Sequence, residues 1–283
     1  MSHTRRHFLT SLGAAAVGLV STRRTLAALG AASARLSRIG IQLYTLRSAA
    51  AADLAGVLES LAKIGYKEVE FAGYHNHPTS EVRDLLTQNG LTAPSAHIDL
   101  DLIETKPAAT FADAKTVGLE WITVPSLPRG PHETADDWKQ LARRFNKAGA
   151  RVKEAGFRFA FHNHTDVIKP TGELQVVPID ILMKETDPAL VSYEMDIYWV
   201  VNAGADPLAL LARFPGRFKM LHVKDSAGRP DHKMVDVGAG TIDFKKIFAN
   251  ANGIEHYFVE HDSPADAIAS ATASYKYLSA LEF

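Results

Sequence analysis

Cysteine is absent from the 283-residue chain. Without a thiol, the protein has no disulfide, no thiolate nucleophile and no cysteine-ligated zinc or iron–sulfur centre. An excess of charge is also missing, because 31 Lys and Arg residues balance 32 Asp and Glu residues, for a formal net charge of −1. That balance provides no electrostatic basis for binding nucleic acid or an anionic membrane surface.

Several common catalytic and nucleotide-binding motifs are missing as well. No G-x-G-x-x-G follows the first predicted strand, and no Gly-x-Ser-x-Gly occurs. The glycines of Gly238-Ala239-Gly240 lack the following Lys and Ser or Thr of a phosphate-binding loop. A dinucleotide site, a serine hydrolase and a P-loop enzyme therefore have no support in the sequence.

The N-terminal segment has the pattern of an export signal. A twin-arginine pair, Arg5-Arg6, precedes an apolar run over residues 8–20, and Ala32-Ser33-Ala34 offers a cleavage site. A run of roughly 13 residues is shorter than the ~20 that span a bilayer. We expect residues 1–34 to be a twin-arginine signal peptide and the protein to be periplasmic or secreted, without stable membrane insertion after cleavage. An uncleaved anchor and an amphipathic helix are the alternatives.

The remaining residues, 35–283, alternate short apolar runs with amphipathic stretches. The predicted strands are Ile39–Tyr44, Glu68–Phe71, Thr92–His97, Trp121–Pro125, Phe157–His164, Leu190–Asp196, Phe218–Val223 and Tyr257–Glu260. The predicted helices are Asp53–Ile64, Ser80–Asn89, Pro107–Val117, Ala135–Ala155, Pro178–Thr186, Asp206–Phe214, Asp243–Ala251 and Pro264–Leu281. Regular alternation of this kind indicates parallel strands.

Eight strand–helix units in about 250 residues predict a single α/β domain, a closed (β/α)8 TIM barrel. A doubly wound open sheet is the structural alternative. Gly65 and Gly118 stand where a helix needs a residue with positive φ before the next strand begins. No linker or second domain is evident after residue 35.

The later predicted strands end in potential metal ligands. These are His162, Asp196, His222 and Glu260, spaced by roughly one βα unit of a ~250-residue barrel. Because active sites of such barrels lie at the carboxyl ends of the strands, we expect the four side chains to meet at one rim. Imidazole and carboxylate ligands together suit Mn²⁺, Zn²⁺, Co²⁺ or Fe²⁺ better than Ca²⁺. A single histidine at the end of a strand is more often structural. Four potential ligands at the ends of successive strands favour a site for one divalent metal.

With these residues in place, the chain resembles the sugar phosphate isomerase/epimerase family of the xylose isomerase-like TIM barrel superfamily. The resemblance is carried by residues 40–47 (GIQLYTLR), 65–70 (GYKEVE), 162–164 (HNH), 196–199 (DIYW) and 222–225 (HVKD). It covers about Arg38 to Leu281. Relatives in the superfamily include ketose 3-epimerases, inosose dehydratase, 3-keto-glycoside lyases and hydratases, and metal-dependent abasic-site endonucleases.

The resemblance implies one divalent metal, held in the family by Glu, Asp, His and Glu from strands five to eight. Asp196, His222 and Glu260 match that set, whereas His162 stands where an epimerase has glutamate. The ion is left open among Mn²⁺, Zn²⁺, Co²⁺ and Mg²⁺. His164 is the alternative ligand if His162 turns away.

The departure at His162 bears on the mechanism. In the ketose 3-epimerases that this chain resembles, two metal-bound glutamates lie on opposite faces of the substrate. Only one of the two positions, Glu260, is a glutamate in this sequence. A one-base reaction therefore fits better: aldose–ketose proton transfer, or loss of an α-proton with a β-oxygen. The candidate catalytic residues are Glu260, Lys224 and His164. For Lys224, an ion pair with Asp225 or another carboxylate is the structural alternative.

Five further residues are candidates for substrate binding, each with ordinary packing or hydrogen bonding as the alternative. Two lie at the predicted inward positions of the first strand, two end the second and third strands, and one is an aromatic residue beside the metal-ligand aspartate. In that order they are Gln42, Tyr44, Glu70, His97 and Trp199.

We therefore expect a metal-dependent isomerase- or epimerase-like enzyme that acts on a small-molecule sugar or keto-sugar by removing an α-proton. The alternatives are a 3-keto-glycoside lyase or hydratase and a non-catalytic periplasmic sugar-binding barrel. An abasic-site endonuclease is opposed by the net charge of −1. The sequence leaves the substrate, the metal and the oligomeric state open, a homo-oligomer included.

Overall fold

A computed structural model describes residues 34–170 and 177–283. The predicted signal peptide over residues 1–34 lies outside them except for its last residue. Within the described residues, eight parallel strands form a closed barrel in the order β1-β10-β7-β6-β5-β4-β3-β2. They are β1 (Gly40–Gln42), β2 (Glu68–Phe71), β3 (Thr92–His97), β4 (Trp121–Val124), β5 (Arg158–His162), β6 (Ser192–Asp196), β7 (Phe218–Val223) and β10 (His256–Val259).

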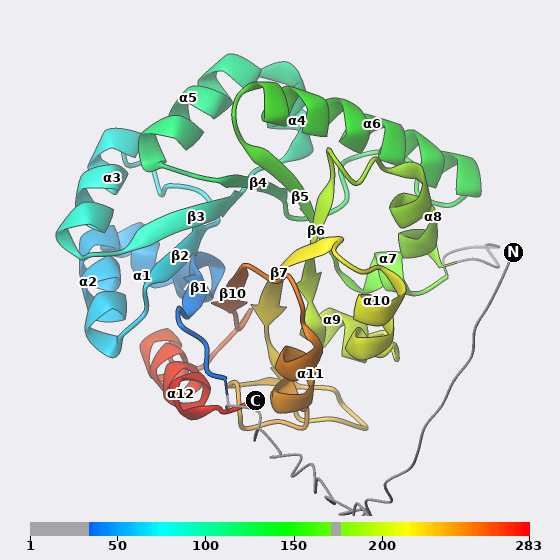
Figure 1. Cartoon of the computed structure of the whole chain (residues 1–283). Helices are drawn as coiled ribbons and strands as arrows, with labels where there is room; N and C mark the ends of the chain where they lie inside the picture. Colours follow the sequence, from blue (N-terminus) through cyan, green and yellow to red (C-terminus); the bar gives the residue numbers. More distant parts are fainter. Residues whose placement is uncertain (1–33, 171–176) are drawn as a thin grey trace, which may run out of the picture. The chain divides into compact units, whose positions relative to one another are not determined.

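Helices surround the barrel (Figure 1). The longer ones are α2 (Leu54–Ile64), α3 (Thr79–Gln88), α5 (Pro107–Val117), α6 (Ala135–Glu154), α8 (Pro178–Glu185), α10 (Pro207–Arg213), α11 (Phe244–Asn250) and α12 (Ala267–Ala280). Short segments at strand ends include the 3-10 helix η1 (Leu43–Leu46), α1 (Arg47–Ala52), α4 (Leu100–Thr105), α7 (Thr165–Ile168), α9 (Ile197–Asn202) and the hairpin β8 (Asp225–Ser226) with β9 (Met234–Val235). None of the described helices is both long and apolar enough to cross a bilayer. The closed barrel of eight parallel strands with helices around it confirms the predicted (β/α)8 fold.

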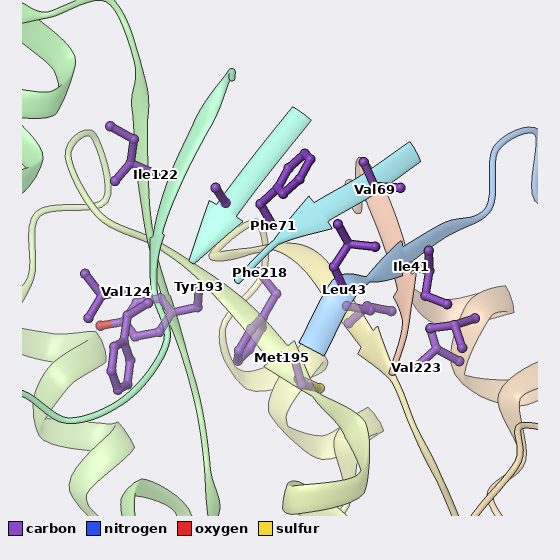
Figure 2. Packing of buried hydrophobic residues seen from close by; sticks show 14 of the residues in the cluster. Ile41, Leu43, Val69, Phe71, Ile122, Val124, Tyr193, Met195, Phe218 and Val223 are labelled. Atoms are coloured by element: carbon purple, nitrogen blue, oxygen red, sulfur yellow. The ribbon is translucent and has the colours of Figure 1, made fainter. Parts of the chain in front are cut away.

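Strand periodicity separates two layers of side chains. Outward residues of the strands, such as Ile41, Val69, Ile122 and Val223, are buried between the barrel and its helices (Figure 2). Inside the barrel, Trp121, Ala160, Met220 and Phe258 form a separate apolar cluster. The inward positions nearer the carboxyl ends are polar, so the barrel has an apolar plug beneath a polar layer.

The amphipathic pattern of α6 shows how a helix is attached to the barrel. Thr134 and Asp137 form a reciprocal capping box that satisfies backbone N–H groups at the start of the helix. Trp138, Leu141 and Phe145 follow at helical spacing and are buried. At about 1.5–3 kcal/mol for each fully buried large apolar side chain, this stripe holds α6 against the strands.

One close approach requires glycine inside the barrel. A Cβ atom on Gly40 would lie 2.5 Å from the ring of Phe258. The side chain of Phe258 fills the space that the side chain of residue 40 would otherwise take. Gly65 and Gly118 have φ of 126° and 91°, as expected of residues that end a helix before the next strand.

The predicted first strand, Ile39–Tyr44, is wrong at its end. The strand stops at Gln42, whose side-chain oxygen accepts a hydrogen bond from the backbone N–H of Tyr44 at 3.0 Å. This cap begins the 3-10 helix η1, so Tyr44 does not occupy an inward strand position and its side chain is 43% exposed. The predicted fifth strand is also shorter, because it ends at His162 rather than His164.

Candidate metal centre

The four predicted metal ligands meet inside the barrel. His162, Asp196, His222 and Glu260 each offer one ligand atom, and these atoms lie within 4.8 Å of one another. His162 Nε2 is 3.3 Å from Asp196 Oδ2, and His222 Nδ1 is 2.7 Å from Glu260 Oε2. All four side chains are at most 5% exposed. Two imidazoles and two carboxylates in this arrangement match the donors that divalent transition metals prefer.

Hydrogen bonds orient both imidazoles toward this cluster. His162 Nδ1 donates to the carbonyl of Pro125 at 2.9 Å, which leaves the Nε2 lone pair facing Asp196. Burial, together with the nearby His222 ring, lowers the pKa of His162 to about 3, so this ring is neutral at neutral pH. His222 uses Nε2 for a second set of carboxylates, which leaves Nδ1 for the cluster. Partners of this kind fix which ring nitrogen is available to a metal.

Asp196 is positioned by both of its neighbouring elements. It ends β6 and caps α9, because its Oδ1 atom accepts a hydrogen bond from the backbone N–H of Trp199 at 3.0 Å. Its own backbone N–H donates to Asn163 Oδ1 at 3.1 Å. Oδ1 of Asp196 therefore caps the helix, and Oδ2 remains available to a metal at the cluster.

Lys224 lies at the same cluster and is almost fully buried. Its Nζ atom is 2.9 Å from Asp196 Oδ2, 2.7 Å from Glu260 Oε2 and 2.9 Å from Asp262 Oδ1. The predicted ion pair of Lys224 with a carboxylate is confirmed, and its partners are these three residues rather than Asp225. Asp225 instead accepts backbone hydrogen bonds, including those from Gly238 and Gly240.

The charges in the cluster stabilise one another. Burial raises the pKa of Glu260, but the Lys224 ammonium and the His222 ring outweigh it and hold that pKa well below its usual range. Burial lowers the pKa of Lys224, and the carboxylates of Asp196 and Glu260 raise it well above its usual range. At neutral pH the carboxylate and the ammonium are both charged, in direct contact.

A second group of ligand atoms lies on the other side of the His222 ring. Glu70 Oε2 and Glu194 Oε2 are 2.7 and 3.1 Å from His222 Nε2. His97 Nε2 is 3.1 Å from Glu194 and 3.4 Å from Glu70. Burial lowers the pKa of His97, but the two carboxylates outweigh this effect and raise it. His222 thus connects the two groups through its two nitrogens.

Glu194 is the site residue that the sequence interpretation missed. It is fully buried, and its Oε1 atom has no hydrogen-bond partner among the described residues. The available signal was parity: Glu194 precedes Asp196 by two residues on the same strand, so both side chains point into the barrel.

The candidate substrate-binding residues divide into two groups. Gln42 and Glu70 are fully buried and bonded to each other, with Gln42 Nε2 donating to Glu70 Oε2 at 2.8 Å. Glu70 also contacts His222 Nε2, so this pair belongs to the second group of side chains and helps to orient the His222 ring. Tyr44 and His97 line a pocket of about 530 Å³, and Trp199 lies beside His164, with ring centroids 5.5 Å apart.

A divalent ion fits the first cluster on charge as well as on ligand type. Four fully or nearly fully buried carboxylates, Glu70, Glu194, Asp196 and Glu260, lie together in the described part of the barrel. Lys224 contacts Asp196 and Glu260, and His222 contacts Glu70, Glu194 and Glu260. Burying carboxylates without compensating positive charge is costly. An ion held by His162, Asp196, His222 and Glu260 would supply positive charge in place of the proton that it displaces from His222.

We expect Glu194→Gln to weaken metal binding roughly 10–100-fold, the usual cost of losing an outer-shell partner of a ligating histidine. The change removes the negative charge that faces His222 Nε2–H without removing a candidate ligand of the first cluster. Titration with Co²⁺, followed by absorbance, measures the affinity. Glu185→Gln, the same change at an exposed position on α8, is the control. Equal affinities in the two variants would contradict the supporting role.

The geometry defines a class of protein: a closed (β/α)8 barrel with a histidine–carboxylate cluster among its inward residues. The chain belongs to the xylose isomerase-like TIM barrel family, whose model matches residues 58–277. Among solved structures it is similar to a sugar phosphate isomerase/epimerase from Parabacteroides distasonis ATCC 8503. The two share 27% sequence identity and a TM-score of 0.77, over 89% of this chain and 97% of that one.

Among curated proteins the chain is similar to inosose dehydratases. It is 34% identical over 134 residues to that of Lacticaseibacillus casei, which is 42% of this chain and 44% of the relative. It is 26% identical over 252 residues to that of Geobacillus thermodenitrificans, which is 75% of this chain and 83% of the relative. The chain therefore spans less than half the length of the first of these relatives.

Proposed function

We propose that the protein is a metal-dependent lyase acting on a keto-sugar, which removes the proton next to the ketone and expels an oxygen substituent from the adjacent carbon. The observation that carries this proposal is the contact between Glu260 Oε2 and Lys224 Nζ at 2.7 Å. A base and an acid side by side can move one proton from carbon to a leaving oxygen on the same face of the substrate. The similarity to inosose dehydratases supports this type of reaction.

The residues take the following roles in the proposal. Glu260 accepts the proton from carbon, a double bond forms as the carbon–oxygen bond breaks, and Lys224 donates a proton to the leaving oxygen. The proton on Glu260 then returns to Lys224 across their hydrogen bond, so the net change is elimination. A divalent ion at the cluster, when bound, would polarise the ketone and stabilise the developing negative charge. His164 and Trp199 lie beside Glu260 and Lys224 and would form one wall of the sugar-binding site.

Isomerisation or epimerisation is the second candidate, favoured by the similarity to the Parabacteroides structure. Epimerisation needs proton donors on opposite faces of the substrate. The additional carboxylates, Glu70 and Glu194, are fully buried against His222 and His97, so a second base at the rim would have to be His162 or His164.

Incubation in D₂O separates these functions. The metal-loaded protein is incubated with methyl 3-keto-β-glucopyranoside or inosose, and the reaction is monitored by NMR. We expect deuterium exchange next to the ketone and an unsaturated or hydrated product. The same protein treated with a chelator is the control. An epimer as the main product would show that the protein is an epimerase, and metal and sugar binding without turnover would indicate a sugar-binding barrel.

A further inference from the structure

The pocket beside the candidate centre is larger than a keto-sugar requires. Its volume is about 530 Å³. At roughly 30 Å³ per water molecule in the liquid, that equals about 18 waters, whereas a hexose has about a dozen non-hydrogen atoms. The volume lies in the range of roughly 300–1,000 Å³ typical of pockets that enclose larger organic ligands.

The pocket lies next to the candidate centre at His97 and Pro125, whereas Glu260 and Lys224 are not among its lining residues. His97, which lines it, contacts Glu194 at 3.1 Å, and its ring centroid is 5.2 Å from that of His222. Pro125, also in the lining, accepts the hydrogen bond from His162. A molecule reacting at the cluster would extend past His97 to enter this space.

Apolar side chains form much of the lining. Tyr44 and Leu102, at 43% and 39% exposure, are the exposed large hydrophobic residues of the described chain, and both line this pocket. Exposed apolar surface gathered at a concave site marks a place where a ligand is buried. The Tyr44 ring is supported by Arg47, whose guanidinium lies 4.2 Å from the ring centroid and donates to the carbonyl of Asp262.

The charges of the lining oppose an anionic occupant. Asp99 and Asp113 are exposed at the pocket, and no lysine or arginine is among its lining residues. A phosphate group would meet these two carboxylates, and the one basic side chain of the lining, His97, already faces Glu70 and Glu194. A neutral group remains, and the buried hydroxyl of Tyr74, a lining residue, has no hydrogen-bond partner among the described residues.

We infer that this pocket binds a neutral, apolar aglycone, such as an aryl group, attached to the keto-sugar that reacts at Glu260. The inference rests on the proposed function, because the aglycone oxygen is then the group that leaves. It names the substrate class as uncharged glycosides with an apolar aglycone rather than free or phosphorylated sugars.

Two matched substrates test the inference. Phenyl and methyl 3-keto-β-glucopyranoside differ only in the group that would enter the pocket, and we expect a KM at least tenfold lower for the phenyl compound. Leu102→Ala should raise the KM for the phenyl compound about tenfold and leave that for the methyl compound within twofold. Leu208→Ala on α10, remote from the pocket, is the control. Equal KM values for both compounds would overturn the inference while the elimination itself stands.

A binding measurement keeps the inference testable if neither compound turns over. Saturation-transfer NMR with phenyl 3-keto-β-glucopyranoside then reports contact between the protein and the aryl protons. A signal in wild type that is lost in Leu102→Ala supports the pocket even though the proposed reaction fails. The absence of an aryl signal in wild type overturns the inference.

Discussion

Replacing Glu260 by Gln is expected to lower turnover by roughly 10²–10⁴-fold, the usual contribution of a general base. The amide keeps one oxygen toward His222 and Lys224, so the site stays filled, but it cannot accept a proton. Steady-state rates with the keto-glycoside, and metal content of the purified variant, are the measurements. We expect the metal to be retained with weaker affinity, because three candidate ligands remain.

Glu255→Gln is the matched control for this change. Glu255 precedes β10, the strand that Glu260 follows, and forms an ion pair with Arg158 outside the candidate site. It should retain wild-type turnover, since surface ion pairs contribute little to stability. Full activity of Glu260→Gln, with metal bound, would assign the base to another residue and remove the central step of the proposed elimination.

Removing the metal with a chelator is expected to abolish turnover, by at least about 10³-fold, because Lewis-acid stabilisation of charge is worth several kcal/mol and each 1.36 kcal/mol is tenfold in rate. The melting temperature should fall too. A ligand that binds only the folded state at 100 times its Kd stabilises by about 2.7 kcal/mol. At about 2–4 °C per kcal/mol for a domain of this size, the decrease is roughly 5–10 °C.

Metal affinity should also rise with pH. Burial lowers the pKa of His222, but Glu194 and Glu260 outweigh it and raise that pKa well above its usual range, so metal-free His222 is protonated at neutral pH. A metal must displace that proton, and lower pH therefore opposes binding. His162, with its pKa lowered to about 3, already offers a free nitrogen. Calorimetry in two buffers of different ionisation enthalpy would measure the proton release.

Asp196→Asn provides the control for metal removal. Asparagine can replace aspartate as the cap of α9, where the side chain accepts from the backbone N–H of Trp199. It removes one charged ligand from the cluster. This variant should fold and, with three candidate ligands left, its melting temperature should respond less to the chelator than that of wild type. A wild-type melting temperature that does not respond to the chelator would contradict a bound metal in the folded protein.

Much of the fold was predictable from local patterns. Alternating strands and amphipathic helices, with glycines such as Gly65 and Gly118 at helix ends, required no long-range information. Period-two alternation also predicted that His162, Asp196 and His222 point into the barrel. Errors fell at element ends: the side chain of Gln42 caps a 3-10 helix, so the strand does not reach Tyr44.

The partners within the site could not be predicted in the same way. Glu70 and His222 are 152 residues apart, and they meet because the strands close into a barrel with β2 and β7 across its interior. Strand stagger decided that Glu194 reaches the same ring nitrogen. The partner of Lys224 also depends on this geometry, since Glu260 and Asp262 come from the end of another strand.

The sequence by itself determined the class of fold, the rim where the chemistry-bearing residues gather and four of the residues that meet there, because strand period and unit length are local properties. Only the tertiary structure decided which carboxylate faces which nitrogen of His222, that Lys224 contacts Glu260, and that Tyr44 lines an apolar pocket. These depend on barrel closure and on the stagger between strands, which arise from the packing of the whole chain rather than from any one segment.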